Sequence, residues 1–477
     1  MDKTFAVQCP PFKLQLSHWD KRMGPLYSQR ILCFPLSNNS DEHKAHITQL
    51  LLTALQSTVD KLPFLAGSVS KDKPWLYNLG PKGAAYLEVK DLSSTVNFQD
   101  LRKASFSPTL LDNKQLCPFP EPIYIRDHPV DVCRLRANFV EGGLLLVVSV
   151  IHTVSDGRGI TEVLKIFAEM LRQSQTGELP SRSIDEESTA QNTHSFNRTF
   201  VLSGNGLPGV IENHPAWTTS PYKPLAGSAR KTTSCTVFHI SSDSLRVLKQ
   251  AALPSSLSMS AHAPHQAPRI STHDAIAALI WRSIMLARRR AGINSDRIST
   301  QFCTAVDCRS HLNLPTPYFG NAIYPIKTSL AIPQLAPASA TDGLDVGHML
   351  ELEIVARNIR EKVNGVTADS FRDLLAFAER TEAETPMRLS VWDDMSVGSL
   401  MLVSYFWFEM HELDFGDALG GKIEAFRLPS GGLMPGMPIM LPRLPDGSCE
   451  FVVNEEEVVM KFLREDELLR RFASERC

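Results

Sequence analysis

The hydrophobic positions at the start of the chain predict a strand followed by a helix. An apolar stretch at 30–36 predicts the strand, and Ser40 is then placed to cap a helix that Lys61-Leu62-Pro63 ends. This helix would carry its apolar residues on one face, namely Ile47, Leu50, Leu51, Ala54, Leu55 and Val59. A face of this width is typical of a helix that packs against a sheet.

A strand pair and a second amphipathic helix follow. Residues 132–140 predict a strand, 141–143 a turn, and the unbroken apolar run 144–151 a strand buried on both faces. Segment 157–172 then has the spacing of an amphipathic helix, with apolar residues at 160, 163, 164, 167, 170 and 171. The order of these elements favours a mixed sheet covered by helices.

The composition changes at 173–230, where Ser, Thr, Asn, Pro and Gly replace the apolar runs. A structureless loop of this length is unusual inside one domain, so we expect an interdomain crossover. The chain of 477 residues is also too long for a typical single domain of ~150 residues. We therefore expect an N-terminal domain at 1–172, a crossover at 173–230 and a C-terminal domain at 231–477.

The second half again alternates between predicted strands and helices. Its loop at 254–268 precedes a helix with Ser271 or Thr272 as its cap and three arginines before Gly292 as its end. The expected strands are 233–240, 301–306, 400–404 and 450–453, and the further expected helices are 349–363, 368–380 and 455–473. The fold class is thus α/β or α+β.

Composition and charge exclude several classes of protein. Hydrophobic residues make up 43% and charged residues 21%, which is ordinary for a globular chain, and the net charge of −3 leaves no basic surplus for nucleic acid. The longest apolar run is far shorter than the ~20 residues of a membrane span, and the start resembles no secretory leader. We expect a cytoplasmic protein with neither a membrane nor a nucleic acid as partner.

Cysteine and histidine spacing give no sign of a metal site. The nine cysteines form no C-x-x-C pair, and the 14 histidines show no metal-ligand spacing. An odd number of cysteines in apolar settings indicates free thiols. We expect no metal cofactor.

The sequence from His152 to Gly157 is the strongest candidate for chemistry. A buried strand delivers His152, Asp156 follows four positions later, and Gly157 permits a tight turn or a close ligand. A neutral histidine on a rigid strand end can serve as a general base, although a histidine satisfied within the core is the alternative. The same spacing recurs at His239, where Ser241 is a natural helix cap and Asp243 a first-turn acid.

Several blocks, spread over nearly the whole chain, resemble the BAHD superfamily of CoA-dependent acyltransferases. Val-Asp-x-Arg-Ser and Tyr-Phe-Gly-Asn match one family block, and HxxxDG matches its first signature. In the family's order, the matching blocks are Leu16-Ser17-x-x-Asp20 with Tyr27, Leu62 to Gly67, His152 to Gly157, Ser271 to Ala275 through Trp281-Arg282, Val306 to Ser310 with Tyr318 to Asn321, and Asp414-Phe415-Gly416. The last block fits only the first three letters of the family's DFGWG, because Asp417-Ala418 stands where Trp-Gly is usual.

The resemblance implies two domains like chloramphenicol acetyltransferase, with a channel between them for acyl-CoA and the acceptor. His152 would act as the general base midway along the channel. Asp156, the second residue of the catalytic motif, would turn away from the channel and pair with Arg309. Gly157 and the block Asp414, Phe415 and Gly416 would be structural, the latter fixing the loop beside the CoA channel.

Two further assignments stay open at this level. Tyr405 stands where many plant members carry a channel-lining tryptophan, so its hydroxyl is either an oxyanion donor or part of a packed ring. The helix start at Ser271 and Thr272, with Arg269 just upstream, is either an anchor for CoA phosphates or a plain helix cap.

The resemblance implies acetyl transfer from acetyl-CoA, or transfer from another acyl-CoA, to the hydroxyl or amine of a small natural product. The style of the sequence is similar to the fungal secondary-metabolite branch, such as the trichothecene O-acetyltransferases. A closed two-domain enzyme of this type is expected to act as a monomer. The alternatives are a cyclase or intramolecular acyl-transfer catalyst that uses no CoA, and a catalytically silent metabolite-binding protein.

Overall fold

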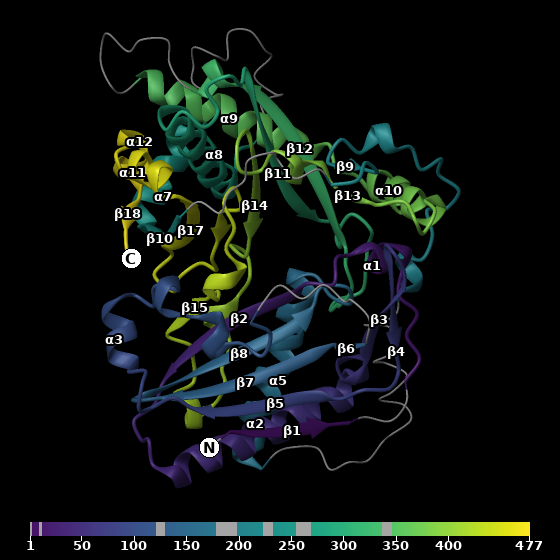
Figure 1. Cartoon of the computed structure of the whole chain (residues 1–477), viewed down its shortest axis with the longest axis vertical. Helices are drawn as coiled ribbons and strands as arrows, with labels where there is room; N and C mark the ends of the chain where they lie inside the picture. The colour runs from purple at the N-terminus through teal and green to yellow at the C-terminus, as the bar shows by residue number, and fades with distance from the viewer. Residues whose placement is uncertain are drawn as a thin grey trace.

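Two sheet-rich domains lie one above the other in the computed structural model (Figure 1). The purple and blue elements of the first half form the lower domain, and the green, teal and yellow elements of the second half form most of the upper one. The structure describes residues 2–8, 12–120, 129–177, 198–222, 232–253, 269–335 and 346–477. The expected mixed α/β class is confirmed.

The first sheet has six strands in the order β1-β5-β7-β8-β2-β15. Every residue of β8 is buried, because strands cover both of its edges and side chains cover both of its faces. Helices α2 and α5 pack against each other and share one hydrophobic core with the sheet. The bounds are β1 Lys3–Val7, β5 Ala85–Asp91, β7 Cys133–Val140, β8 Gly143–Ile151, β2 Tyr27–Pro35, β15 Ala425–Arg427, α2 Asp41–Lys61 and α5 Gly157–Thr176.

Local capping explains where α2 begins and where α5 begins and ends. The Ser40 side chain accepts a hydrogen bond from the backbone N–H of His43, which confirms the predicted cap of α2. Asp156 caps α5 in the same way, and Gly177 ends that helix with a left-handed φ of 73°. The strands predicted at 132–140 and 144–151 are confirmed as β7 and β8.

Strand β15 comes from the second half of the chain but belongs to the first sheet. It pairs antiparallel with β2, with Ala425 opposite Cys33 and Arg427 opposite Ile31. It is the edge strand of the lower sheet, and Figure 1 labels it beside β2. The domain limits at 1–172, 173–230 and 231–477 stay predictions, and β15 shows that a strand from the second half of the chain completes the first sheet.

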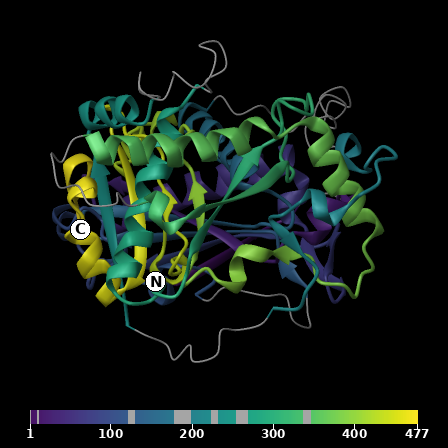
Figure 2. The ribbon, with the colours of Figure 1, turned by 90° about the horizontal axis from the view of Figure 1, so that it is seen from above.

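The second sheet has seven strands in the order β12-β11-β14-β16-β17-β10-β18. Helices α8 and α9 pack together, and α7, α11 and α12 complete the core on the same sheet (Figure 2). The strands are β10 Thr233–Ile240, β11 Ser299–Asp307, β12 Ile323–Ala331, β14 Ser399–Ser404, β16 Ile439–Met440, β17 Cys449–Glu456 and β18 Ser474–Glu475. The helices are α7 Ser242–Ala251, α8 Thr272–Arg290, α9 Val346–Asn364, α11 Glu457–Arg464 and α12 Glu467–Phe472.

The single helix predicted at 455–473 is wrong. Strand β17 continues to Glu456, and two short helices, α11 and α12, follow it. Asp466 separates them, because its carboxylate accepts from the backbone N–H of Leu469 as a new N-cap and from Arg282 Nη1 at 2.6 Å. A tertiary ion pair therefore interrupts an apolar pattern that reads as one helix.

Much of the predicted crossover lies outside the described residues, which omit 178–197 and 223–231; the loop at 254–268 is also outside them. The described part at 198–222 packs against α10 (Ala368–Arg380), and its strand β9 (Trp217–Thr218) pairs with β13 (Arg388–Leu389). The remaining elements are α1 His18–Arg22, β3 Ser68–Lys73, β4 Leu76–Gly80, α3 Phe98–Lys103, α4 Asn113–Leu116 and β6 Val130–Asp131. Across the described ranges, no helix is long and apolar enough to cross a membrane.

Candidate active site

His152 lies directly after the buried strand β8, at the level where the two sheets meet. Its backbone N–H donates to the Leu26 carbonyl at 2.7 Å, and its own carbonyl accepts from Asn321 Nδ2 at 3.0 Å. The backbone on either side of the ring is thus held by both halves of the chain. The strand end is the rigid mount that a positioned base requires.

His152 as a residue is partly exposed, and the Nδ1 atom of its ring is buried without a hydrogen-bond partner among the described residues. Burial lowers the pKa of His152 below its ordinary value, and the nearby Asp156 carboxylate offsets this effect only in part. The imidazole is therefore neutral at neutral pH. A neutral imidazole can accept a proton, which a buried imidazolium cannot do.

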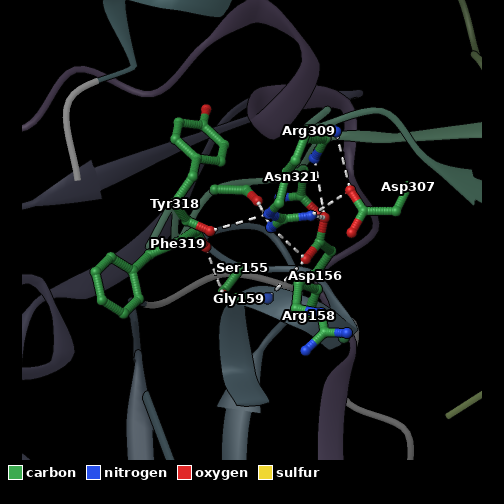
Figure 3. A network of polar contacts seen from close by, with 12 residues as sticks. Ser155, Asp156, Arg158, Gly159, Asp307, Arg309, Tyr318, Phe319 and Asn321 are labelled. Atoms are coloured by element: carbon green, nitrogen blue, oxygen red, sulfur yellow. Dashed lines mark hydrogen bonds and ion pairs between the residues drawn. The ribbon is translucent and has the colours of Figure 1, made fainter. Parts of the chain in front are cut away.

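Asp156 is completely buried and makes four hydrogen bonds. Arg309 donates to both of its oxygens, at 2.8 and 3.0 Å, and the backbone N–H groups of Gly159 and Ala322 donate at 2.9 Å each (Figure 3). Burial alone would raise the pKa of Asp156, but the Arg309 charge and these hydrogen bonds lower it. The pairing of Asp156 with Arg309 is confirmed, and it leaves the carboxylate occupied by partners other than the histidine ring.

Arg309 joins the second half of the chain to the start of α5. Besides Asp156, its guanidinium donates to the carbonyls of Tyr318 and Gly320 and to Asp307. Burial would lower the pKa of Arg309, yet the two carboxylates raise it, so the side chain is always charged. One arginine thus orders both the loop at 318–320 and the turn after His152.

Asn321 links the same turn to a second buried ion pair. Its Nδ2 donates to Asp20 Oδ1 at 2.8 Å as well as to the His152 carbonyl. Asp20 pairs with Arg198 at 3.2 Å, and both side chains are fully buried. The Arg198 Nη2 in turn donates to the Val154 carbonyl at 2.8 Å. These hydrogen bonds and the ion pair therefore fix the segments around residues 20, 152, 198 and 321 relative to one another.

A close approach of backbone fixes the start of α5 against the loop at 318–320. The Ser155 hydroxyl donates to the Phe319 carbonyl at 2.7 Å, and a Cβ atom on Gly159 would overlap that carbonyl (Figure 3). Only glycine fits at 159 for this reason. Sequence reasoning singled out Gly157 and missed Gly159, because the constraint comes from a loop over 150 positions away.

Tyr405 lies beside Gly157, in a group of aromatic rings. Its ring centroid is 5.4 Å from that of Phe408 and 5.8 Å from that of Phe426, and a Cβ atom on Gly157 would approach both the Phe408 and Tyr405 rings. The ring is packed. The alternative role of its hydroxyl as an oxyanion donor stays a prediction.

Asp414, Phe415 and Gly416 lie at the opposite end of α5 from His152. Gln175 near the C-terminus of α5 donates to the Phe415 carbonyl at 2.8 Å and accepts from the Ala418 N–H, while Asp414 accepts from the Gly416 N–H. Gln175 is 18 residues after Gly157, roughly 27 Å along a helix. This block is docked on the helix far from the histidine, and its structural role beside a CoA channel stays a prediction.

The start of α8 is closed by side chains of its own and of α9. Ser271 and Asp274 form a capping box, and Arg360 donates to both of them. Thr272 is partly buried, and Arg269 is exposed just before the helix. His273 lies 6.3 Å from the Phe406 ring, so this helix start adjoins the segment that contains Tyr405. The capping interpretation of Ser271 is confirmed, and phosphate binding stays a prediction.

No group of three or more potential metal ligands occurs among the described side chains. The described cysteines are free thiols, as expected. His239 lies on β10, and Ser241 caps α7 through the Ser244 N–H, as predicted.

The sequence and the fold are both similar to those of known proteins. The sequence profile of the Transferase family matches residues 6–418. Over its full length the chain is 45% identical to the enoyl-CoA isomerase/hydratase claC of Penicillium crustosum, of which it spans 52%. It is 24% identical to the eremophilane O-acetyltransferase prx11 of Penicillium rubens, with 97% of the chain and 98% of the relative covered. The crystal structure of F. graminearum TRI101 with coenzyme A and deoxynivalenol is similar at a TM-score of 0.80 and 23% identity, covering 98% of this chain and 100% of that one.

Proposed function

Because the chain belongs to the Transferase family, that is, the BAHD superfamily of acyltransferases, we propose that it transfers an acetyl group from acetyl-CoA to a hydroxyl of a small natural product. The enzyme class is acyltransferase, and members of the family use acyl-CoA as the acyl donor. The observation that carries the proposal is His152 on a strand end that both halves of the chain hold, where burial lowers the pKa of its imidazole.

His152 accepts the proton of the acceptor hydroxyl while the oxygen attacks the carbonyl carbon of the thioester. The new C–O bond gives a tetrahedral oxyanion, and its collapse breaks the C–S bond. The imidazolium returns its proton to the departing sulfur, so the products are the ester and free CoA thiol. A positioned base of this kind contributes ~10²–10⁴ to the rate.

Asp156 stabilises the turn after His152 and takes no part in the proton transfer. Its oxygens are taken by Arg309, Gly159 and Ala322, and His152 Nδ1 has no partner within the described parts of the chain. An Asp–His relay of the serine-protease type is therefore not part of the proposal. Asp156 and Arg309 hold the start of α5 in place, so that the His152 backbone keeps its position.

The name of claC favours a second candidate, the hydration or isomerisation of an enoyl-CoA. That protein is about twice as long as the matched region, so the name describes a larger chain than this one. Both reactions start from a CoA thioester. They differ in their products, because acyl transfer releases a thiol and hydration keeps the thioester intact.

Incubation with acetyl-CoA and a panel of alcohols, followed by a free-thiol assay, separates the candidates. We expect thiol release that depends on the alcohol and disappears in His152→Ala. Loss of the conjugated absorbance of an enoyl-CoA, without thiol release, would instead support the claC-type activity. If CoA does not raise the melting temperature at saturation, the CoA-independent cyclase or a silent binding protein gains support.

An acceptor of hydroxyl type, a monomeric state and a cytoplasmic location belong to the same proposal. The acetyltransferase relatives support the first, since their names specify O-acetyl transfer. A mass measurement in solution tests the second. Binding of the CoA phosphates at Arg269 and Thr272 is also proposed, with the exposed Arg269 as the charged contact.

A further inference from the structure

Three consecutive carbonyl groups, beginning with that of the candidate base, accept hydrogen bonds from side chains. Asn321 Nδ2 donates to the carbonyls of His152 and Thr153, at 3.0 and 3.4 Å. The carbonyl of Val154 accepts from Arg198 Nη2 at 2.8 Å. Two side chains from distant parts of the sequence therefore hold the backbone of the turn that carries the His152 ring.

Asp20 is the carboxylate to which both of these donors are bound. Its Oδ1 accepts from the backbone N–H and from Nδ2 of Asn321, at 3.0 and 2.8 Å, and its Oδ2 lies 3.2 Å from Arg198 Nε. The side chains of Asp20 and Arg198 are completely buried, so solvent does not compete for either of them. One acid therefore determines where the two donors to the turn lie.

Helix α1 holds Asp20 in place through a capping box. The N–H and the hydroxyl of Ser17 donate to Asp20 Oδ2 at 3.1 and 2.8 Å, and the Asp20 N–H donates to the Ser17 hydroxyl at 2.9 Å. The acid is thus mounted on the first half of the chain, while Asn321 belongs to the second half and Arg198 to the segment between them. The turn after His152 is held where these three parts of the chain meet.

The contacts of Arg198 favour positioning of the turn over stability alone. Its Nε and Nη1 atoms make no hydrogen bond among the described residues, although the side chain is completely buried. A buried ion pair offsets the cost of its desolvation only when further hydrogen bonds complete it. The hydrogen bond that Arg198 does make goes to the Val154 carbonyl, two residues beyond the base.

We propose that Asp20 is a positioning residue of the acyl transfer: through Arg198 and Asn321 it holds the turn after β8, so that the His152 ring stays directed at the acceptor hydroxyl. The inference rests on the proposed role of His152 as the general base. Asp20 acts through the backbone of the turn and exchanges no proton with the acceptor. A base displaced by about 1 Å can lose ~10²-fold in rate, while a substrate held by other residues keeps its affinity.

The test measures kcat and the affinity for CoA separately. Asp20→Asn keeps the shape of the side chain and an acceptor for Asn321, but it removes the charge that pairs with Arg198. We expect kcat, counted per CoA-binding site by isothermal titration calorimetry, to fall about tenfold or more while the Kd of CoA is unchanged. Arg198→Lys keeps the charge and lacks the planar fork that reaches both Asp20 and the Val154 carbonyl, so its kcat should fall by a smaller factor.

Asp373→Asn is the matched control, because Asp373 is a buried acid that also binds the crossover. It accepts from the N–H groups of Gly209 and Val210 at 2.7 and 3.3 Å, and from His214. This variant should lower the melting temperature and keep kcat per CoA-binding site. An unchanged kcat in a folded Asp20→Asn, a parallel loss of CoA affinity, or an equal fall of kcat in Asp373→Asn would overturn the proposal.

Arg198→Lys decides the case in which Asp20→Asn does not fold and binds no CoA. A lowered kcat per CoA-binding site in Arg198→Lys, with the Kd of CoA unchanged, would then support the proposal. An unchanged kcat would overturn it. Failure of Arg198→Lys to fold would also overturn it, because the ion pair would then serve the fold alone.

His152→Ala separates this inference from the proposed function. If this variant keeps full transfer activity, the proposed function fails, whatever Asp20→Asn shows. If transfer depends on His152 while a folded Asp20→Asn keeps the kcat of the parent enzyme, only the role of Asp20 fails.

Discussion

The Asp156 carboxylate receives two hydrogen bonds from the Arg309 guanidinium, at 2.8 and 3.0 Å, across the boundary between the two sheets. Asp156 caps the helix that follows His152, and Arg309 follows strand β11 of the second sheet. This buried ion pair is therefore one of the contacts that set the relative position of the two domains at the site, together with the hydrogen bonds of Asn321 and Ser155.

Removing either partner of this pair should cost more stability than removing both. Asp156→Ala or Arg309→Ala leaves a buried charge without its partner, so each should lower the free energy of unfolding by about 3–5 kcal/mol. The double variant should lose less stability than either single variant, because it leaves neither charge without its partner. Urea unfolding measures all three. As a control, Asp243→Ala breaks an exposed pair with Arg246 and should leave stability unchanged.

The pH dependence of transfer should follow the lowered pKa of His152. The base works only in its neutral form, so kcat/KM should hold its plateau down to and below the ordinary histidine value of ~6.5 before it falls. Initial rates measured over a pH series at a subsaturating acceptor concentration give the midpoint of this fall in kcat/KM. A midpoint clearly above the ordinary value would contradict a base buried in this way.

His152 should also make stability depend on pH, and the sign follows from proton counts. Between the lowered pKa of the folded state and ~6.5, the unfolded chain binds more protons at this residue than the folded protein does. The contribution of His152 is therefore present at high pH and is lost as pH falls through this window. The slope of melting temperature against pH should be shallower in His152→Gln than in the parent.

Gly159→Ala should destabilise the protein more than Gly157→Ala. The new methyl group at 159 would overlap the Phe319 carbonyl, which is backbone, whereas at 157 it meets the edge of the Phe408 ring, which can turn aside. Overpacking of the first kind costs ~1–3 kcal/mol. Thermal melting ranks the variants, with Gly432→Ala as the control, because a Cβ atom there meets nothing within 4 Å.

Ser271→Ala should weaken the fold without changing the affinity for acyl-CoA. The hydroxyl accepts from the Asp274 N–H and is contacted by Arg360, so its loss should cost ~1 kcal/mol, as for other helix caps. Arg269→Ala is the paired variant, which should raise KM for acyl-CoA and leave the melting temperature unchanged. If Ser271→Ala raises KM for acyl-CoA and Arg269→Ala does not, phosphate binding would instead be assigned to the helix cap at Ser271.

Sequence reasoning succeeded where the determinants are local. The caps at Ser40, Ser241 and Ser271 were predicted because a cap depends on the next three residues alone. The strand that delivers His152 was predicted because both of its faces are apolar.

What was missed depends on residues far apart in the chain. The break at Asp466 is set by Arg282, and the need for glycine at 159 is set by Phe319. Arg198 gives no local signal, since only the fold brings it to Asp20 and to the Val154 carbonyl. The resemblance supplied the Asp156–Arg309 pair, which spacing alone would not have found.

The pairing of β15 with β2 determines when the first sheet can be completed during synthesis. Residues 425–427 complete a sheet whose other strands all lie before residue 152. During synthesis the β2 edge of that sheet is bare while more than 270 further residues are added. The first domain can therefore reach its final form only after residues 425–427 have left the ribosome, long after its other strands have been made.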